Sequence, residues 1–237
     1  SCIFPAPPAA SNMNDLEESM QYQGIFFDFD YTLGDATEAI VAGFRYAFEQ
    51  MGLPEPGYED IRRTVGLVLE DGYTALSGEH DPAQRARFRQ LYVAKATPLQ
   101  VERAQLCPGG AELLQALHEA GVPAGVVSSK GAPVLREILK ARGVEGLLCS
   151  VTGGDQVTHP KPDPEGLLSA IAAQGLVPEQ VLFCGDTLID GETAQRAGTH
   201  FCAVLNGTTT AQDFAASGLP CVHVAPDLWE LKQWLGV

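Results

Sequence analysis

The fold of this chain is most constrained by short apolar runs in which polar residues do not alternate with apolar ones. Six such runs occur, at residues 24–29, 124–128, 147–151, 181–184, 201–205 and 221–224. Strands of this kind are typical of sheets covered on both faces, as parallel sheets are. Helical patterns lie between most of the runs, at 110–120, 132–142, 164–174, 190–197 and 226–235. The alternation predicts an α/β fold with a doubly wound (Rossmann-like) parallel sheet.

One interval departs from this rhythm. Roughly ninety residues separate the first apolar run from the second, and none of them forms a convincing strand pattern. Such a gap is far longer than a usual strand-to-helix loop. Helical patterns fill it, near 35–50, 58–65, 69–77 and 82–96, the first opened by a predicted capping box from Asp35 to Glu38. We therefore predict an all-helical cap domain at 36–104, inserted into an α/β catalytic core formed by 21–35 and 105–237.

Residues 1–20 differ from the rest of the chain in composition. They are rich in Pro, Ala, Ser and Asn, and then become acidic. They have neither the basic start nor the apolar stretch of a signal peptide, so we expect a flexible N-terminal tail.

Composition and charge narrow the class of partner. Hydrophobic residues make up 45% of the chain and charged residues 19%, as in a globular protein. No apolar run approaches the ~20 residues of a membrane span. The net charge of −15 argues against nucleic acid or an anionic membrane as a partner. Six cysteines without CxxC spacing argue against zinc and favour a reducing, cytoplasmic location.

Polar clusters follow four of the strands, where a doubly wound sheet binds its ligands. Asp28 and Asp30 stand out because Phe27 and Phe29 flank them, and burying a carboxylate is costly unless it is paired. Successive strand residues alternate in direction, so these two acids share a side. The remaining candidates are Thr32, Ser128, Ser129, Lys130, Lys161, Asp186 and Asp190.

Structural roles remain open for several of these residues. Ser128 and Ser129 can form a turn or a helix N-cap, and Asp190 can cap the helix that follows it. Lys161 lies between two prolines and can be an ordinary solvated loop lysine.

Taken together, the clusters resemble the motifs of the haloacid dehalogenase (HAD) superfamily of hydrolases, in the family's order. They read "DFDYT", "VVSSK", "HPKPDP" and "GDTLID", and the similarity covers roughly residues 22–237. The stretch "TVGLVLEDGY" is similar to the helical cap of the phosphoglycolate phosphatase-like branch. Tyr31 departs from the pattern, because these phosphatases usually carry Gly there. We expect it to narrow or reshape the mouth of the site.

The resemblance implies a magnesium-dependent phosphatase that hydrolyses a small phosphate monoester, phosphoglycolate-like, through an aspartyl-phosphate. Asp28 is then the nucleophile, Asp30 the general acid and base, and Lys161 the neutralising cation. The implied Mg2+ ligands are Asp28, Asp30 through its backbone carbonyl, Asp186 and Asp190. The implied substrate-binding residues are Thr32, Ser128, Ser129, Lys130 and, from the cap, Arg63.

Other functions on the same motifs stay open. A phosphomutase of the β-phosphoglucomutase type would use the same two acids, and a nucleotidase or pyrophosphatase would share the fold. A dehalogenase is disfavoured by Asp30, and a phosphonatase by the absence of lysine from 36–94. A non-enzymatic metabolite-binding domain is disfavoured because all the acids and Lys161 are present. In each case the expected partner is a small phosphorylated metabolite.

Overall fold

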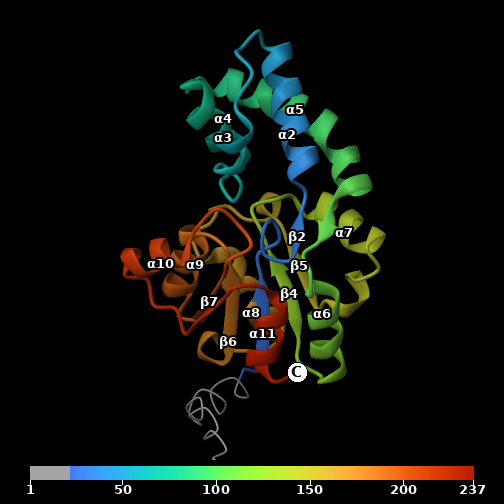
Figure 1. The fold of residues 1–237 in the computed structure, drawn as a ribbon, viewed down its shortest axis with the longest axis vertical. Helices are drawn as coiled ribbons and strands as arrows, with labels where there is room; N and C mark the ends of the chain where they lie inside the picture. Colours follow the sequence, from blue (N-terminus) through green and yellow to red (C-terminus); the bar gives the residue numbers. More distant parts are fainter. Residues whose placement is uncertain (1–21) are drawn as a thin grey trace, which may run out of the picture.

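Six parallel strands form the central sheet of the computed structural model, which describes residues 22–237 (Figure 1). Their order across the sheet is β5-β4-β1-β6-β7-β8. The strands span Gly24–Phe27 (β1), Ala124–Val127 (β4), Ser150–Thr152 (β5), Val181–Gly185 (β6), His200–Val204 (β7) and His223–Ala225 (β8). The predicted α/β fold class with a doubly wound parallel sheet is confirmed. The predicted tail, 1–20, lies outside the described residues.

Helices cover both faces of the sheet, which explains why its strands do not alternate. Ile25 and Phe27 on one face of β1 belong to a buried cluster that also contains residues of α6, α7 and α11. Phe26 on the other face belongs to a cluster with residues of α8, α9 and α10. These helices span Gly110–Glu119 (α6), Ala132–Ala141 (α7), Glu165–Ala173 (α8), Leu188–Ala197 (α9), Ala211–Ser217 (α10) and Leu228–Leu235 (α11). Among the described residues, no helix is both long enough and apolar enough to cross a bilayer.

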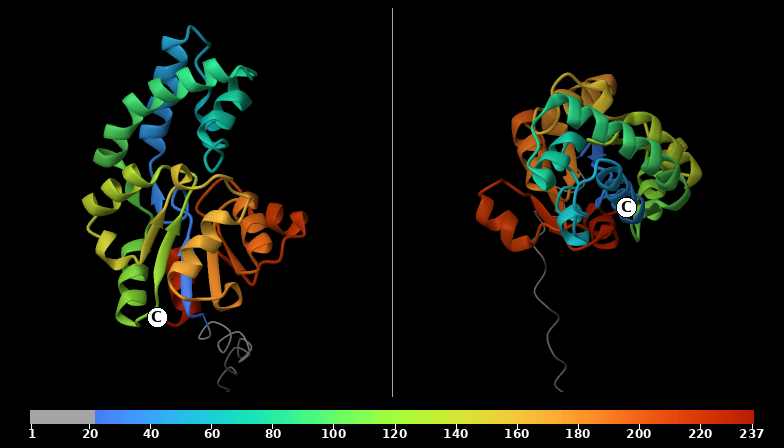
Figure 2. Two further views of the ribbon diagram at one scale, coloured as in Figure 1. Left: turned by 180° about the vertical axis from the view of Figure 1, so that it is seen from behind. Right: turned by 90° about the horizontal axis from the view of Figure 1, so that it is seen from above.

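The stretch predicted to form the cap holds four helices. They lie beyond the carboxyl ends of the sheet strands (Figures 1 and 2). They span Thr37–Gln50 (α2), Tyr58–Arg62 (α3), Leu69–Ser77 (α4) and Pro82–Arg103 (α5). A cluster of buried aromatic rings packs α2, α4 and α5 together, with Tyr73 stacked on Phe88 at 4.6 Å between ring centroids. Two short strands, β2 (Gly34–Asp35) and β3 (Gln105–Leu106), pair antiparallel where the chain enters and leaves these helices.

Several element boundaries differ from those predicted. Helix α5 continues from the expected end near 96 to Arg103, passing through Pro98. A proline removes one backbone hydrogen bond, and here the carbonyl left without it belongs to Ala94, an exposed residue that water can reach. Strand β5 begins at Ser150, not at 147, because residues 145–147 form a 3-10 turn. Helix α10 and the β2–β3 pair have no counterpart in the sequence pattern.

The predicted capping box at the start of α2 is wrong in its partners. The carboxylate of Asp35 accepts hydrogen bonds from the backbone N–H and the hydroxyl of Thr37, at 2.8 and 2.5 Å. Glu38 is exposed and faces Arg103 across 4.0 Å. An acid therefore still satisfies a donor in the first turn, but it stands before the helix and makes a local turn.

Candidate active site

The polar clusters lie where β1, in the middle of the sheet, pairs with β4 on one side and β6 on the other. This is the point from which the chain winds in both directions, and ligands bind there in such sheets. Hydrogen bonding continues just past the strand ends. The N–H of Asp28 donates to the carbonyl of Cys184 at 2.9 Å, and that of Ser128 to Thr152 at 3.0 Å. The backbone of both residues is therefore held by the sheet.

Three buried carboxylates meet at this edge. Asp28, Asp186 and Asp190 each offer an oxygen within 4.8 Å of the others. Asp190 comes from the first turn of α9, and Gly185 allows its approach, since a Cβ at residue 185 would lie 2.4 Å from the Asp190 Cβ. The helix-capping alternative for Asp190 is wrong in position, because Thr187 is the N-cap of α9. One oxygen of Asp190 accepts from the hydroxyl of Thr187 at 2.7 Å, as the second partner of a capping box.

Lys161 supplies the positive charge of this cluster. Its Nζ donates to Asp28 at 3.0 Å and to Asp190 at 2.7 Å, and its side chain is only 7% exposed. Burial alone would lower the pKa of Lys161, but the charges of Asp190 and Asp28 and their hydrogen bonds raise it above its usual value. Lys161 is therefore a buried ammonium and not a solvated loop lysine.

The acids carry more negative charge than Lys161 can balance. Burial raises the pKa of Asp28 to about 6, against the attraction of Lys161, and the charges of Asp190 and Asp30 add to the rise. Burial, followed by the charges of Asp190 and Asp28, raises the pKa of Asp186 well above its usual value. With all three carboxylates ionised, one ammonium leaves two excess negative charges. A divalent cation with a preference for oxygen ligands, such as Mg2+, fits this donor set.

Asp30 lies apart from these three acids and has its own cation. Its carboxylate accepts from the Nζ of Lys130 at 2.8 Å, and both side chains are largely buried, at 11% and 9% exposed. The same Nζ donates to the side-chain oxygen of Gln100, which comes from α5. A side chain of the helical part thus bonds to the lysine that pairs with the acid following β1.

The other predicted site residues take different positions. The hydroxyl of Thr32 donates to Asp186 at 3.2 Å, and that of Ser129 donates to the carbonyl of Gly66, at 3.0 Å, in the loop before α4. The hydroxyl of Ser128 accepts from the N–H of Lys130 at 3.2 Å. Arg63 is not brought to the cluster: its side chain is 70% exposed, and its guanidinium lies 3.8 Å from Asp60. Substrate contacts of these residues remain predictions.

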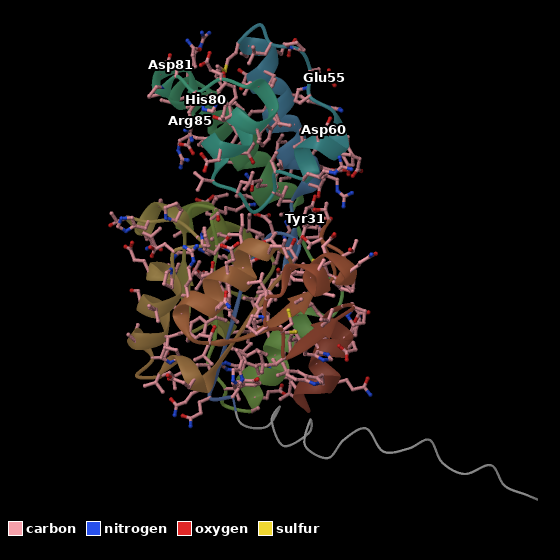
Figure 3. The ribbon with its side chains drawn as sticks, turned by 90° about the vertical axis from the view of Figure 1, so that its left-hand side faces the viewer. Tyr31, Glu55, Asp60, His80, Asp81 and Arg85 are labelled. Atoms are coloured by element: carbon pink, nitrogen blue, oxygen red, sulfur yellow. The ribbon has the colours of Figure 1, made fainter. Side chains whose placement is uncertain are left out.

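Tyr31 joins the sheet to the helices, and its expected effect on the mouth of the site stays a prediction. It is 4% exposed and adopts a φ of 59°, a conformation that L residues rarely take. Its hydroxyl bonds to Thr37 at 2.7 Å and accepts from Arg62 at 3.3 Å, while the Arg62 guanidinium lies 5.5 Å from its ring centroid. Figure 3 shows Tyr31 at the junction of the two parts.

A cavity of about 330 Å3 lies between the sheet edge and the helices. Asp28, Asp30, Ser128 and Lys130 line it from the sheet side. From the helical side it is lined mainly by apolar residues, together with Tyr92 and Gln100. Sequence reasoning missed these last two. Their spacing of eight residues on one helix, with Ala96 between them, places them on one face and could have revealed them.

Comparison with known proteins identifies the family. The family model described as "Haloacid dehalogenase-like hydrolase" matches residues 25–204. The chain belongs to the haloacid dehalogenase-like hydrolases. This HAD-like hydrolase is 37% identical to a haloacid dehalogenase-like hydrolase from Bacteroides fragilis, whose crystal structure aligns with a TM-score of 0.85 over 89% of this chain and 99% of the other.

Among curated proteins, phosphoglycolate phosphatases are similar to this HAD-like hydrolase. The protein from Salmonella typhi is 29% identical over 207 residues, which cover 78% of this chain and 81% of the relative. That from Escherichia coli (strain K12) is 28% identical with the same coverage. These matches confirm the resemblance and the expected enzyme class, an HAD-like phosphatase. The roles of individual residues are not tested by them.

Proposed function

We propose that this protein hydrolyses a small phosphate monoester through a phosphoryl group carried on Asp28. The observation that carries the proposal is the buried group of Asp28, Asp186, Asp190 and Lys161 beside a cavity of about 330 Å3. The names of the curated relatives, phosphoglycolate phosphatases, support the class of reaction. The carboxylate of Asp28 attacks phosphorus, the alcohol leaves, and water then releases inorganic phosphate.

Charge neutralisation is the main requirement of the first step. Two unit charges 4 Å apart repel by about 4 kcal/mol at an effective dielectric of 20, so a carboxylate approaches a phosphate only beside compensating cations. Lys161 already bonds to Asp28 and so lies close to an incoming phosphoryl group. With its pKa at about 6, Asp28 is mostly ionised at neutral pH and able to attack.

Mg2+ is proposed to lie among these acids, where it would neutralise charge on the phosphoryl oxygens. Asp28, Asp186 and the backbone carbonyl of Asp30 are the proposed ligands. Both carboxylate oxygens of Asp190 already accept hydrogen bonds, from Lys161 and from Thr187. Asp190 is therefore proposed mainly to orient Lys161, and Thr32 to orient Asp186.

Asp30 is proposed to move the proton of the reaction. It would protonate the oxygen of the leaving alcohol and then take a proton from the attacking water. Its bond to Lys130 holds the carboxylate on the cavity side, apart from the group around Asp28. Ser128 lines the same cavity and is proposed to hold a phosphoryl oxygen together with nearby backbone N–H groups.

A cytoplasmic location is also proposed. It is supported by the five cysteines among the described residues, which are all free thiols. Cys184 and Cys202 even face each other across β6 and β7 without a disulfide.

The proposed function is tested by trapping the intermediate. The full chain is mixed with a 32P-labelled phosphate ester and Mg2+ and quenched in acid. We expect label on the protein that hydroxylamine removes, because acyl phosphates are cleaved by it. EDTA should prevent the labelling and excess Mg2+ should restore it. Hydrolysis of p-nitrophenyl phosphate without any protein-bound label would exclude the proposed intermediate.

A further inference from the structure

Two largely buried side chains on the helical side of the cavity, those of Tyr92 and Gln100, carry hydrogen-bond donors that no other group in the described part of the chain accepts. Tyr92 is 7% exposed and Gln100 is 3% exposed, and both line the cavity from α5. Within residues 22–237 the Tyr92 hydroxyl makes no hydrogen bond, and the Gln100 side chain only accepts one, from Lys130. A donor left unpaired in the wall of a cavity is free to bond a molecule that enters it, so each is a candidate to meet a ligand there.

Tyr92 lines the same cavity as Asp28 and Asp30. Its ring packs against Phe44 and Phe88, at 5.4 and 5.9 Å between centroids. Burial raises the pKa of Tyr92, and the charge of Asp30 adds to this effect. The hydroxyl is therefore neutral at physiological pH, and close enough to Asp30 to respond to its charge.

The cations that line the cavity are already engaged. They are Arg89, whose guanidinium lies 3.0 Å from Glu70, and Lys130, which lies 2.8 Å from Asp30. Asp28, Asp30 and Asp155 line the same space and make it negative. The rest of the helical side is mainly apolar, formed by Ile40, Phe44, Val65, Leu67, Leu69 and Val93, together with Thr64 and Thr97.

A carboxylate on the leaving group would therefore meet acids and apolar walls without a free cation. A neutral hydroxyl, in contrast, can accept from Tyr92 or from the amide of Gln100 while its carbon chain packs on the apolar wall. We infer that the substrate is the phosphate ester of an uncharged, hydroxyl-bearing alcohol of polyol or sugar type, selected by Tyr92 and Gln100 on α5. The inference rests on the proposed phosphatase function and narrows its substrate class.

Three pairs of substrates isolate the effect of charge on the leaving alcohol, because the two members of each pair differ only by one CH2OH in place of one carboxylate. They are 2-hydroxyethyl phosphate with 2-phosphoglycolate, glycerol 3-phosphate with 3-phosphoglycerate, and glucitol 6-phosphate with 6-phosphogluconate. With the full chain and Mg2+, we expect kcat/KM to be at least about tenfold higher for the neutral member of the best-turned-over pair. Equal values, or preference for the carboxylates, would overturn the inference.

Variants test whether Tyr92 and Gln100 do the selecting. Tyr92→Phe should lower kcat/KM about tenfold more for the best neutral substrate than for p-nitrophenyl phosphate, which has no hydroxyl to bond. Tyr58→Phe, at a tyrosine 47% exposed on α3, is the matched control and should keep the ratio. If Tyr92→Phe does not fold, the ratio of kcat/KM for the best neutral substrate to that for p-nitrophenyl phosphate is measured in Gln100→Met instead. An unchanged ratio in both variants rejects these residues as selectors.

The two levels of the proposal fail in different ways. If p-nitrophenyl phosphate and all six esters are left intact in the presence of Mg2+, the phosphatase function itself is wrong, and the inference falls with it. If p-nitrophenyl phosphate is hydrolysed and the carboxylate esters have the higher kcat/KM, only the assignment of a neutral leaving group is wrong.

Discussion

The sheet side and the helical side of the cavity treat their buried polar groups differently. On the sheet side, Asp28, Asp30, Asp186 and Asp190 each have a partner within the protein. On the helical side, the hydroxyl of Tyr92 and the amide N–H groups of Gln100 are donors without a partner among the described residues. The difference matches two tasks. Phosphoryl transfer is the same for every ester, so its groups can be fixed in advance, whereas selection of the alcohol requires groups that are still free.

The largest effect is expected on the sheet side, from Asp28→Asn. Loss of the nucleophile should lower kcat for p-nitrophenyl phosphate by about 10³-fold or more, and equally for every ester, because this residue does not contact the alcohol. Steady-state assays with circular dichroism as a folding check measure this. Asp60→Asn, at a side chain 62% exposed, is the control. Activity within tenfold of the wild type would remove Asp28 from its proposed role.

Lys161→Met should produce the next largest effect, on stability. It leaves the buried carboxylates of Asp28 and Asp190 without a cation, which costs about 3 kcal/mol in the free energy of unfolding. Urea denaturation at pH 7 in EDTA measures this cost. Lys140→Met, at an exposed helix position, should change stability by less than about 0.5 kcal/mol. A similar change in the two variants would mean that Lys161 is not a buried counter-charge.

The raised pKa of Asp28 predicts a smaller, pH-dependent effect in the metal-free protein. With a folded-state pKa of about 6 instead of 3.8, the folded protein holds a proton that the unfolded chain has already released. Stability should therefore fall as pH rises through this window, by about 1 kcal/mol between pH 5 and pH 7. Denaturation in EDTA should show a slope that is steeper by this amount in the wild type than in Asp28→Asn. Parallel pH profiles would contradict the prediction.

The smallest effect concerns the contact that joins the two sides. Tyr31→Phe removes the hydroxyl that bonds to Thr37 and Arg62, and should cost about 0.5 kcal/mol. A double-mutant cycle with Arg62→Met measures how much of this cost comes from the contact between Tyr31 and Arg62. If the two changes are simply additive in urea denaturation, Tyr31 does not couple the sheet to the helices.

The acids of the sheet side could be predicted because their positions follow from the strands. Once β1 and β6 are recognised as buried parallel strands, Asp28 and Asp186 must share an edge, whatever the chain does in between. Lys161 was predicted from the family resemblance, and its partners Asp28 and Asp190 are consistent with the expected charge. The start of β5 and the presence of α10 were harder to predict, because short elements carry weak periodic signals.

The helical side could not be predicted in the same way. Gln100 reaches Lys130 only because α5 continues beyond Pro98, where the sequence pattern favours an end. The pattern also does not tell which of two adjacent arginines faces the sheet, and it is Arg62, not Arg63, that contacts Tyr31. Rotation of a short helix depends on packing with distant residues, which a local sequence pattern does not contain.

The pairing of β2 with β3 has a consequence for how this architecture can be altered. Asp35 and Gln105 are direct neighbours across that pair, so the 69 residues between them begin and end at one point of the core. A tight turn from Asp35 to Gln105 would leave the path of all six sheet strands unchanged. The intervening helices are therefore geometrically an exchangeable module, and if Tyr92 and Gln100 select the substrate as inferred, that preference would be exchanged with the module while the sheet stays unchanged.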